Sequence, residues 1–211
     1  MKFNCLRQTG AIATGTSAVI LASFLGMTAD AAQASTLIQN GGFESGDFSS
    51  WSETGNIEIT TGIGGVCCRP SEGTYFVDFN GGNRPPNGTL SQTFSTIPGS
   101  EYLLSFDFTK AGIAPGTAQL DIEIDGIQTL LSEVVSDTTG GHPGEYANFS
   151  FLFTADSTST TLTFEDTSIG TANFDALVDN VSVTSTPEPS LLLGLGTLAL
   201  AGGTLLRRKR H

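Results

Sequence analysis

The sequence predicts an all-β protein, an antiparallel two-sheet sandwich of the jelly-roll kind, flanked by an N-terminal signal helix and a C-terminal transmembrane helix. Apolar and polar residues alternate repeatedly along residues 101–183, which is typical of strands with one buried face. Turn-forming dipeptides separate these segments, and residues 35–185 show no apolar repeat at three and four positions. Many short strands in a segment the size of one domain favour a sandwich.

The predicted strands follow one another closely along the chain. In the clearest of them Tyr102, Phe106 and Phe108 share one face, and polar residues such as Asp107 occupy most of the other. Turn sequences such as Pro98-Gly99 favour chain reversals between strands. In chain order the strands are expected at residues 56–61, 74–79, 88–95, 101–109, 120–125, 127–135, 149–154, 161–165 and 177–183.

Residues 1–34 are predicted to be a signal peptide. Lys2 and Arg7 precede an uncharged stretch over residues 11–27, and Ala32-Gln33-Ala34 forms a small-x-small cleavage site. A short membrane anchor is the alternative, but Thr, Ser and Gly dilute the apolar stretch. The folded domain is therefore expected over residues 35–185, outside the cytoplasm.

Residues 186–211 combine a proline-containing triplet, an uncharged span and a basic tail. The span over residues 190–206 would reach about 26 Å as a helix, close to the roughly 30 Å of a hydrocarbon core. The basic tail should stay on the cytoplasmic side. A buried core helix is less consistent, because its basic end would lie against the domain. The residues concerned are Pro187, Glu188 and Pro189 in the triplet, and Arg207, Arg208, Lys209 and Arg210 in the tail.

This order of triplet, apolar span and basic tail resembles the PEP-CTERM sorting signal of bacteria. The resemblance implies an exosortase-type membrane protease as a partner, with cleavage near the Pro-Glu-Pro triplet. It also implies a location in the cell envelope or on the extracellular surface, with the C-terminal helix as an anchor in the membrane, at least before processing.

The charge of the domain limits its partners. The domain contains three basic residues, Arg69, Arg84 and Lys110, and nineteen acidic ones. Its net charge is therefore about −16, compared with −12 for the whole chain. Nucleic acid is excluded as a partner because a basic surface is missing. Calcium would relieve the repulsion between carboxylates, although they could simply keep an exported protein soluble.

Cys67 and Cys68 are the cysteines left once the signal peptide is removed. In an oxidising compartment they are predicted to close a vicinal disulfide that clips a loop, or to pair between chains. A metal or redox centre fits less well, because His142 is the one histidine of the domain.

Several segments of the domain carry a second resemblance. They resemble carbohydrate-binding modules and galactose-binding-like domains, and together they are similar to the choice-of-anchor C proteins, relatives of plant cell-wall domains of unknown function. The resemblance implies a β-sandwich and leaves the ligand open. The segments are residues 37–44 (LIQNGGFE), 48–51 (FSSW), 75–81 (YFVDFNG), 90–94 (LSQTF), 102–107 (YLLSFD) and 178–183 (VDNVSV).

A structural calcium ion is one expectation from this resemblance. Asp179 alternates with the apolar residues of 177–183 and should face the core, where a carboxylate needs a cation or several donors. In galactose-binding-like sandwiches the first and last strands lie close together and often hold calcium. The resemblance implies Glu44 and Asp179 as ligands, with backbone carbonyls around Gly73 completing the shell. The alternative is that Asp179 accepts backbone amide hydrogens or caps a turn.

A sugar site would require exposed aromatic rings and planar polar groups. The loops at residues 65–69 and 80–87 are where we expect it, with Tyr75 and Arg84 as the candidate ligand-binding residues. Trp51 could serve as a sugar platform, but its place near the first strand favours a role in the core.

Catalysis is not predicted. No carboxylate pair stands out from the acidic background, and the hydroxyl and thiol groups lack an obvious base. The prediction is an exported, envelope-sorted bacterial surface protein whose β-sandwich binds extracellular or cell-wall polysaccharide without catalysis. The alternative is a structural or adhesive biofilm-matrix protein with calcium-stabilised contacts between proteins.

Overall fold

A computed structural model of the chain describes residues 35–62, 69–79, 87–112, 115–139, 145–168 and 175–186. All of them belong to one compact unit, residues 34–211. The predicted signal peptide, the sorting signal with its Pro187-Glu188-Pro189 triplet and basic tail, the cysteine pair and Arg84 lie outside these residues. Within the described part of the chain, no helix is long and apolar enough to cross a membrane.

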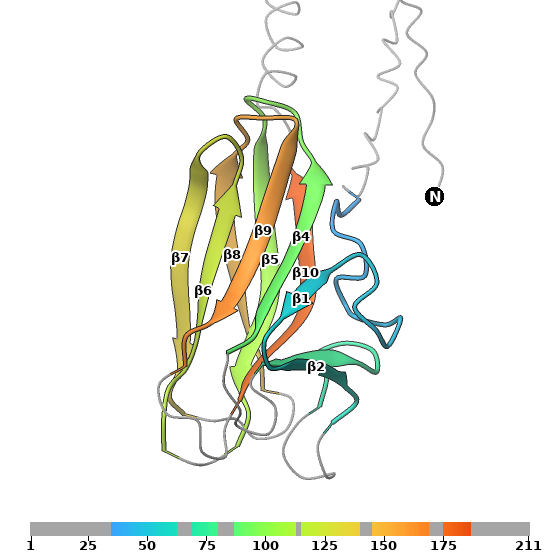
Figure 1. The fold of residues 1–211 in the computed structure, drawn as a ribbon, viewed down its shortest axis with the longest axis vertical. Coiled ribbons are helices and arrows are strands. Elements are labelled where there is room, and N and C mark those ends of the chain that lie inside the picture. Colours follow the sequence, from blue (N-terminus) through green and yellow to red (C-terminus); the bar gives the residue numbers. More distant parts are fainter. Residues whose placement is uncertain are drawn as a thin grey trace, which may run out of the picture. The chain divides into compact units, whose positions relative to one another are not determined.

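The described residues form ten strands in two five-stranded antiparallel sheets (Figure 1). One sheet has the order β1-β4-β9-β6-β7 and the other the order β2-β3-β10-β5-β8. The predicted sandwich of two antiparallel sheets is confirmed. The strands are β1 (Ser52–Thr54), β2 (Ile57–Thr60), β3 (Phe76–Phe79), β4 (Thr89–Ser95), β5 (Glu101–Lys110), β6 (Ala118–Asp125), β7 (Thr129–Asp137), β8 (Ala147–Thr154), β9 (Ser159–Asp166) and β10 (Ala176–Ser185).

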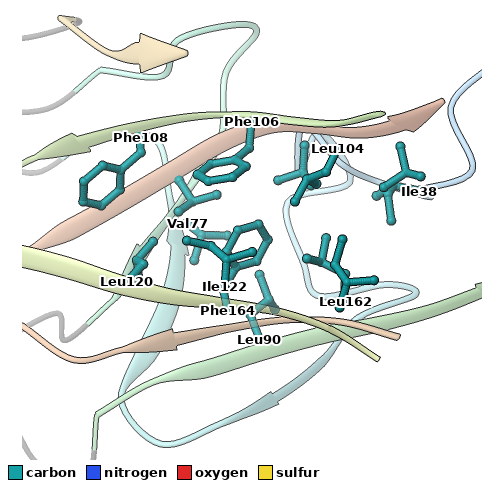
Figure 2. Close-up of a cluster of buried hydrophobic side chains, with 14 of the residues drawn as sticks. Ile38, Val77, Leu90, Leu104, Phe106, Phe108, Leu120, Ile122, Leu162 and Phe164 are labelled. Atoms are coloured by element: carbon teal, nitrogen blue, oxygen red, sulfur yellow. The ribbon is translucent and has the colours of Figure 1, made fainter. Parts of the chain in front are cut away.

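The alternating residues build one apolar core between the sheets. The core-facing residues of β5, including Phe106 and Phe108, are buried. Phe106 meets Phe164 of β9 edge to face, with ring centroids 5.0 Å apart. Figure 2 shows side chains from the two sheets pointing towards each other across this layer. Strands such as β5 therefore have one face in the core and one face free for other contacts.

Nine predicted strands are present, with ends shifted by at most two residues. The prediction missed β1, which pairs with residues 89–91 of β4. All three of its residues are exposed and none is apolar, so no alternation marks it. Pairing with a neighbour, rather than burial of a face, makes this segment a strand.

The segment before β1 runs beside β10. The amide of Leu37 donates to the carbonyl of Val183 at 2.7 Å, and the amide of Val181 donates to the carbonyl of Gly41 at 2.9 Å. A Cβ atom on residue 41 would collide with the carbonyl oxygen of Val181, so glycine permits the close approach of the two backbones. The first residues of the domain are thus hydrogen-bonded to its last strand, β10.

A register shift in β10 moves Asp179 to the unexpected face. The shift lies between Asp179 and Ser182, where Asn180 has a φ of 52°. Val178 and Val181 both face the core, whereas Asp179 pairs with Asp107 of β5 on the outer face. The predicted core-facing position of Asp179 is wrong, because the bulge reverses the alternation.

Candidate functional site

Asp179 anchors the segment that leads into β3. The side chain is fully buried, and its Oδ2 accepts hydrogen bonds from the amides of Ser71 at 2.8 Å and Glu72 at 3.1 Å. Its Oδ1 accepts the amide hydrogen of Asn180 at 2.7 Å. Burial raises the pKa of Asp179, and these hydrogen bonds oppose the rise. The carboxylate therefore ties residues 71–72 to β10.

Glu44, from the N-terminal part of the domain, anchors the same segment. Its Oε1 accepts the amide hydrogens of Thr74 at 2.8 Å and Tyr75 at 2.9 Å. The bonds from Tyr75 and Thr74 lower the pKa of Glu44. Gly73 has a φ of 64°, and a Cβ atom there would collide with the Glu44 carboxylate. We call residues 71–75, held by Glu44 and Asp179, the clamped segment.

The clamped segment bears on the predicted calcium ion. Of the two alternatives for Asp179, the described contacts are those of a carboxylate bonded to backbone amides. Backbone amide hydrogens point at both carboxyl oxygens of Asp179 and at Oε1 of Glu44, the same oxygens that would have to bind a calcium ion. Among the described residues, no three Asp, Glu, His or Cys side chains are grouped so that they could hold a metal ion. The geometry as described does not fit a calcium site, and the ion stays a prediction.

Beside the clamped segment, side chains stand in rows across the outer face of β10, β5 and β8. We call this surface the polar strip. Strand register aligns Asp179, Asp107 and Asn148 in the first row, Ser182, Ser105 and Ser150 in the second, Thr184, Leu103 and Leu152 in the third, and Glu101 and Thr154 in the fourth. Rows two residues apart are about 6.8 Å apart, so the strip is about 20 Å long.

Hydrogen bonds hold the first two rows of the strip in place. Asp107 accepts hydrogen bonds from Nδ2 of Asn148 at 2.8 Å and from Oγ of Ser71 at 2.8 Å. Nδ2 of Asn148 also lies 3.1 Å from Oγ of Ser105. Asn148 and Ser150 are exposed, whereas Asp107 and Ser105 are half-buried. Exposed amide and hydroxyl groups are therefore oriented by partners beneath them.

A hollow of about 440 Å³ opens at the other end of the strip. It lies where β7 and β8, the last strands of the two sheets, run side by side at one edge of the sandwich (Figure 1). Leu152, 54% exposed, presents an apolar surface beside it. The lining residues are Glu101, Gln128, Thr129, Leu130, Leu152, Phe153, Thr154 and Asp156. Polar rows and an apolar end suit a ligand that has hydroxyl groups and an apolar ring face.

The predicted sugar residues have different outcomes. Tyr75 belongs to the clamped segment, is half-buried and lies close to Gly46, while Arg84 lies outside the described residues. Trp51 is 7% exposed, packs against Phe43 and donates from Nε1 to the carbonyl of Asn40 at 3.0 Å. Trp51 is therefore a core residue, as favoured by the sequence.

The polar strip itself was missed at the level of sequence. Asp107, Asn148 and Ser150 occupy the polar positions of alternating segments, which any solvated strand face would show. The register between three strands that are distant in sequence decides that they meet.

Comparisons with known proteins add a family and a fold. A family model described as a protein of unknown function, DUF642, matches residues 29–184. Halomucin of Haloquadratum walsbyi is 27% identical over 174 residues, which cover 75% of this chain. The chain spans about 2% of the length of Halomucin.

The solved structures similar to this chain include carbohydrate-binding modules. TmCBM61, solved in complex with beta-1,4-galactotriose, has a TM-score of 0.54 at 19% identity, over 72% of this chain and all of that one. The CBM22-1 xylan-binding domain of Xyn10C from Paenibacillus barcinonensis has a TM-score of 0.49 at 14% identity, over 74% and 97% of the two chains. The arabinose-bound arabinofuranosidase MgGH51 reaches 0.51 at 8% identity, with 26% of its chain covered and 72% of this one. These likenesses concern the fold alone.

Proposed function

Since this chain belongs to the DUF642 family and folds as a sandwich similar to that of a carbohydrate-binding module, we propose that its domain binds polysaccharide through the polar strip, without catalysis. The network around Asp107 carries the proposal. Asn148 and Ser71 donate to Asp107, so polar groups at the surface are oriented before a ligand arrives. Pre-orientation reduces the entropy that binding a hydroxyl-rich chain would otherwise cost.

The length of the strip favours a chain over a single sugar. Four rows span about 20 Å along the strands, and they run from the acidic and amide row of Asp107 and Asn148 to the hollow beside Leu152. A bound chain would place hydroxyl groups over the polar rows and the apolar face of a sugar ring against Leu152. The polar rows and Leu152 therefore offer contacts to several successive sugars of one chain.

The charge of the domain favours uncharged glycans. Asp107, Asp179 and Glu101 all belong to the strip, and the domain as a whole carries about −16. A polyanionic chain would be repelled, more strongly at low salt. Neutral chains are therefore the ligand class that we propose, and a galactan is the first probe because TmCBM61 was solved with a galactotriose.

Affinity electrophoresis in gels that contain neutral galactan, neutral xylan or an anionic polysaccharide tests this proposal. Asn148→Ala removes the donor to Asp107 and one exposed ligand group, so binding to the neutral glycan should weaken about five- to tenfold, the equivalent of roughly 1 kcal/mol. Thr163→Ala, on the outer face of the other sheet, is the matched control. Equal retardation of both variants would refute the polar strip. Absence of glycan binding together with self-association would favour the adhesive alternative.

We also propose that the protein is exported and sorted to the cell envelope. The support is the order of signal sequence, domain, Pro187-Glu188-Pro189 triplet, apolar span and basic tail. An exosortase-type protease would then be its partner during sorting. Mass spectrometry of the cell-surface protein should find an N-terminus near residue 35 and a C-terminus near the triplet. A protein that stays in the cytoplasm with both ends intact would contradict export and sorting.

A further inference from the structure

Asp78 of β3 is a buried carboxylate that lies outside the polar strip. Its neighbours Val77 and Phe79 face the main core, so Asp78 points to the outer side of its sheet. There its register neighbours are Leu177 of β10 and Glu58 of β2. The side chain is 0% exposed, and neither of its carboxylate oxygens accepts a hydrogen bond from the residues that the structure describes.

The groups around Asp78 are mostly acidic. Burial, followed by the charges of Asp175, Glu58 and Asp166, raises the pKa of Asp78 to about 8. Asp175 and Asp166 each have a buried oxygen that accepts no hydrogen bond within the described part of the chain. The titratable groups on the elements packed around this end of the sheet are Glu58 of β2, Lys110 of β5, Tyr146, which contacts the small apolar cluster of Phe76 and Leu177, Asp166 of β9 and Asp175 before β10.

An ionised carboxylate in this position would lack compensation. Burial without a donor or a counter-ion strongly disfavours the charged form. In the part of the chain that the structure describes, the acidic side chains are not grouped so that they could hold a metal ion. A proton is the neutralising partner that the described surroundings permit.

We propose that Asp78 carries a proton in the folded domain, and that loss of this proton in mildly alkaline solution releases β2 and β3 from the edge of their sheet. The ladder between β3 and β10 is short, with three residue pairs, Ala176 with Phe79, Leu177 with Asp78 and Val178 with Val77. Ionised Asp78 lies in the middle of this contact and opposite Glu58. Repulsion and solvation of the new charge both favour separation.

The direction of the pH dependence follows from the raised pKa. The unfolded chain releases this proton near pH 3.9, whereas the folded domain holds it to about pH 8. The stabilising contribution is therefore complete below about pH 4 and is lost progressively as the pH rises through about 8. The protonated Asp78 therefore stabilises the domain most in acid, and this contribution decreases steadily between about pH 4 and about pH 8.

Thermal unfolding of the full chain between pH 5 and 9 tests this device. The wild type should melt at progressively lower temperature as the pH rises, Asp78→Asn should abolish most of that slope, and Glu53→Gln on the exposed strand β1 should retain it. Hydrogen exchange should show the amides of β2 and β3 opening first. A flat wild-type profile, or the same slope in Asp78→Asn, would overturn the proposal.

Infrared spectroscopy keeps the proposal testable if Asp78→Asn does not fold. The folded wild type at pH 6 should show the carbonyl band of a protonated carboxyl group that disappears above about pH 8. Glu58→Gln removes the acidic neighbour, so the disappearance should move to lower pH. A band that is absent at pH 6, or a midpoint that Glu58→Gln leaves unchanged, would overturn the assignment to Asp78.

Discussion

Replacing Asp179 by alanine removes one of the two anchors of the clamped segment. In the wild type its two oxygens accept the amide hydrogens of Ser71, Glu72 and Asn180, at distances between 2.7 and 3.1 Å. Alanine leaves all of these donors without that acceptor. Residues 71–75 should therefore detach from β10 while Glu44 still holds their other end.

The expected loss is on the order of 2–4 kcal/mol. Hydrogen bonds to a charged group contribute about 1.5–3 kcal/mol each, but their sum is an overestimate for two reasons. Burial disfavours the charged form of Asp179, as its raised pKa indicates, so alanine removes that penalty too. Ser71 is half-exposed and Glu72 exposed, so water can replace part of what is lost. For a domain of about 150 residues this corresponds to roughly 5–15 °C in Tm.

Calorimetry of the full chain and of Asp179→Ala, at several pH values and with calcium or a chelator, measures this loss. Because burial raises the pKa of Asp179, its contribution is complete below about pH 4 and decreases as the pH rises through the raised value. The difference in Tm should therefore narrow with rising pH. A bound calcium ion would reverse the trend, since it holds the carboxylate ionised, and the chelator would then lower the Tm of the wild type alone.

Two outcomes would refute the reasoning. If Asp179→Ala melts within about one degree of the wild type at pH 5, with and without calcium, the clamped segment contributes nothing to stability. If the variant loses stability but hydrogen exchange at residues 71–75 is unchanged, Asp179 stabilises something other than this segment.

The remaining predictions concern the core and the second anchor. Phe164→Ala should destabilise the domain by about 3–5 kcal/mol in urea unfolding, because a fully buried ring that meets Phe106 leaves a cavity between the sheets; a loss below about 1 kcal/mol would contradict the packing described. Glu44→Gln should make the stability of the domain less sensitive to acid. Hydrogen bonds from the backbone amides of Tyr75 and Thr74 lower the pKa of Glu44. The stabilisation by Glu44 is therefore present above about pH 4.3 and is lost as the pH falls through the lowered pKa. Identical acid unfolding profiles for the variant and the wild type would rule this out.

The sequence was sufficient to predict the layers of the domain. Phe106 and Phe108 on one face, with polar residues on most of the other, specify a strand with a single buried side, and repetition of that pattern implies two sheets packed face to face. Such information is local, because a side chain that alternates needs no knowledge of its partners. Ser52–Thr54 shows the limit, since a short exposed strand has no buried face to mark it.

The positions of polar groups at the site could be predicted only in part. Glu44 and Asp179 were predicted as calcium ligands, which stays a prediction, and in the structure both accept amide hydrogens from residues 71–75. The face that Asp179 occupies was wrong, because a bulge at Asn180 reverses the alternation. A single added residue moves every later side chain of a strand to the other face.

What the sequence determined by itself is therefore the kind of fold, the burial of its aromatic residues and the acidic character of its surface, all of which follow from residue type and period. Only the tertiary structure decided that Asp107, Asn148 and Asp179 form one row, and that Asp78 lies buried beside Glu58. The physical reason is register. Pairing between strands far apart in the chain depends on the packing of the whole core, and no single segment contains that information.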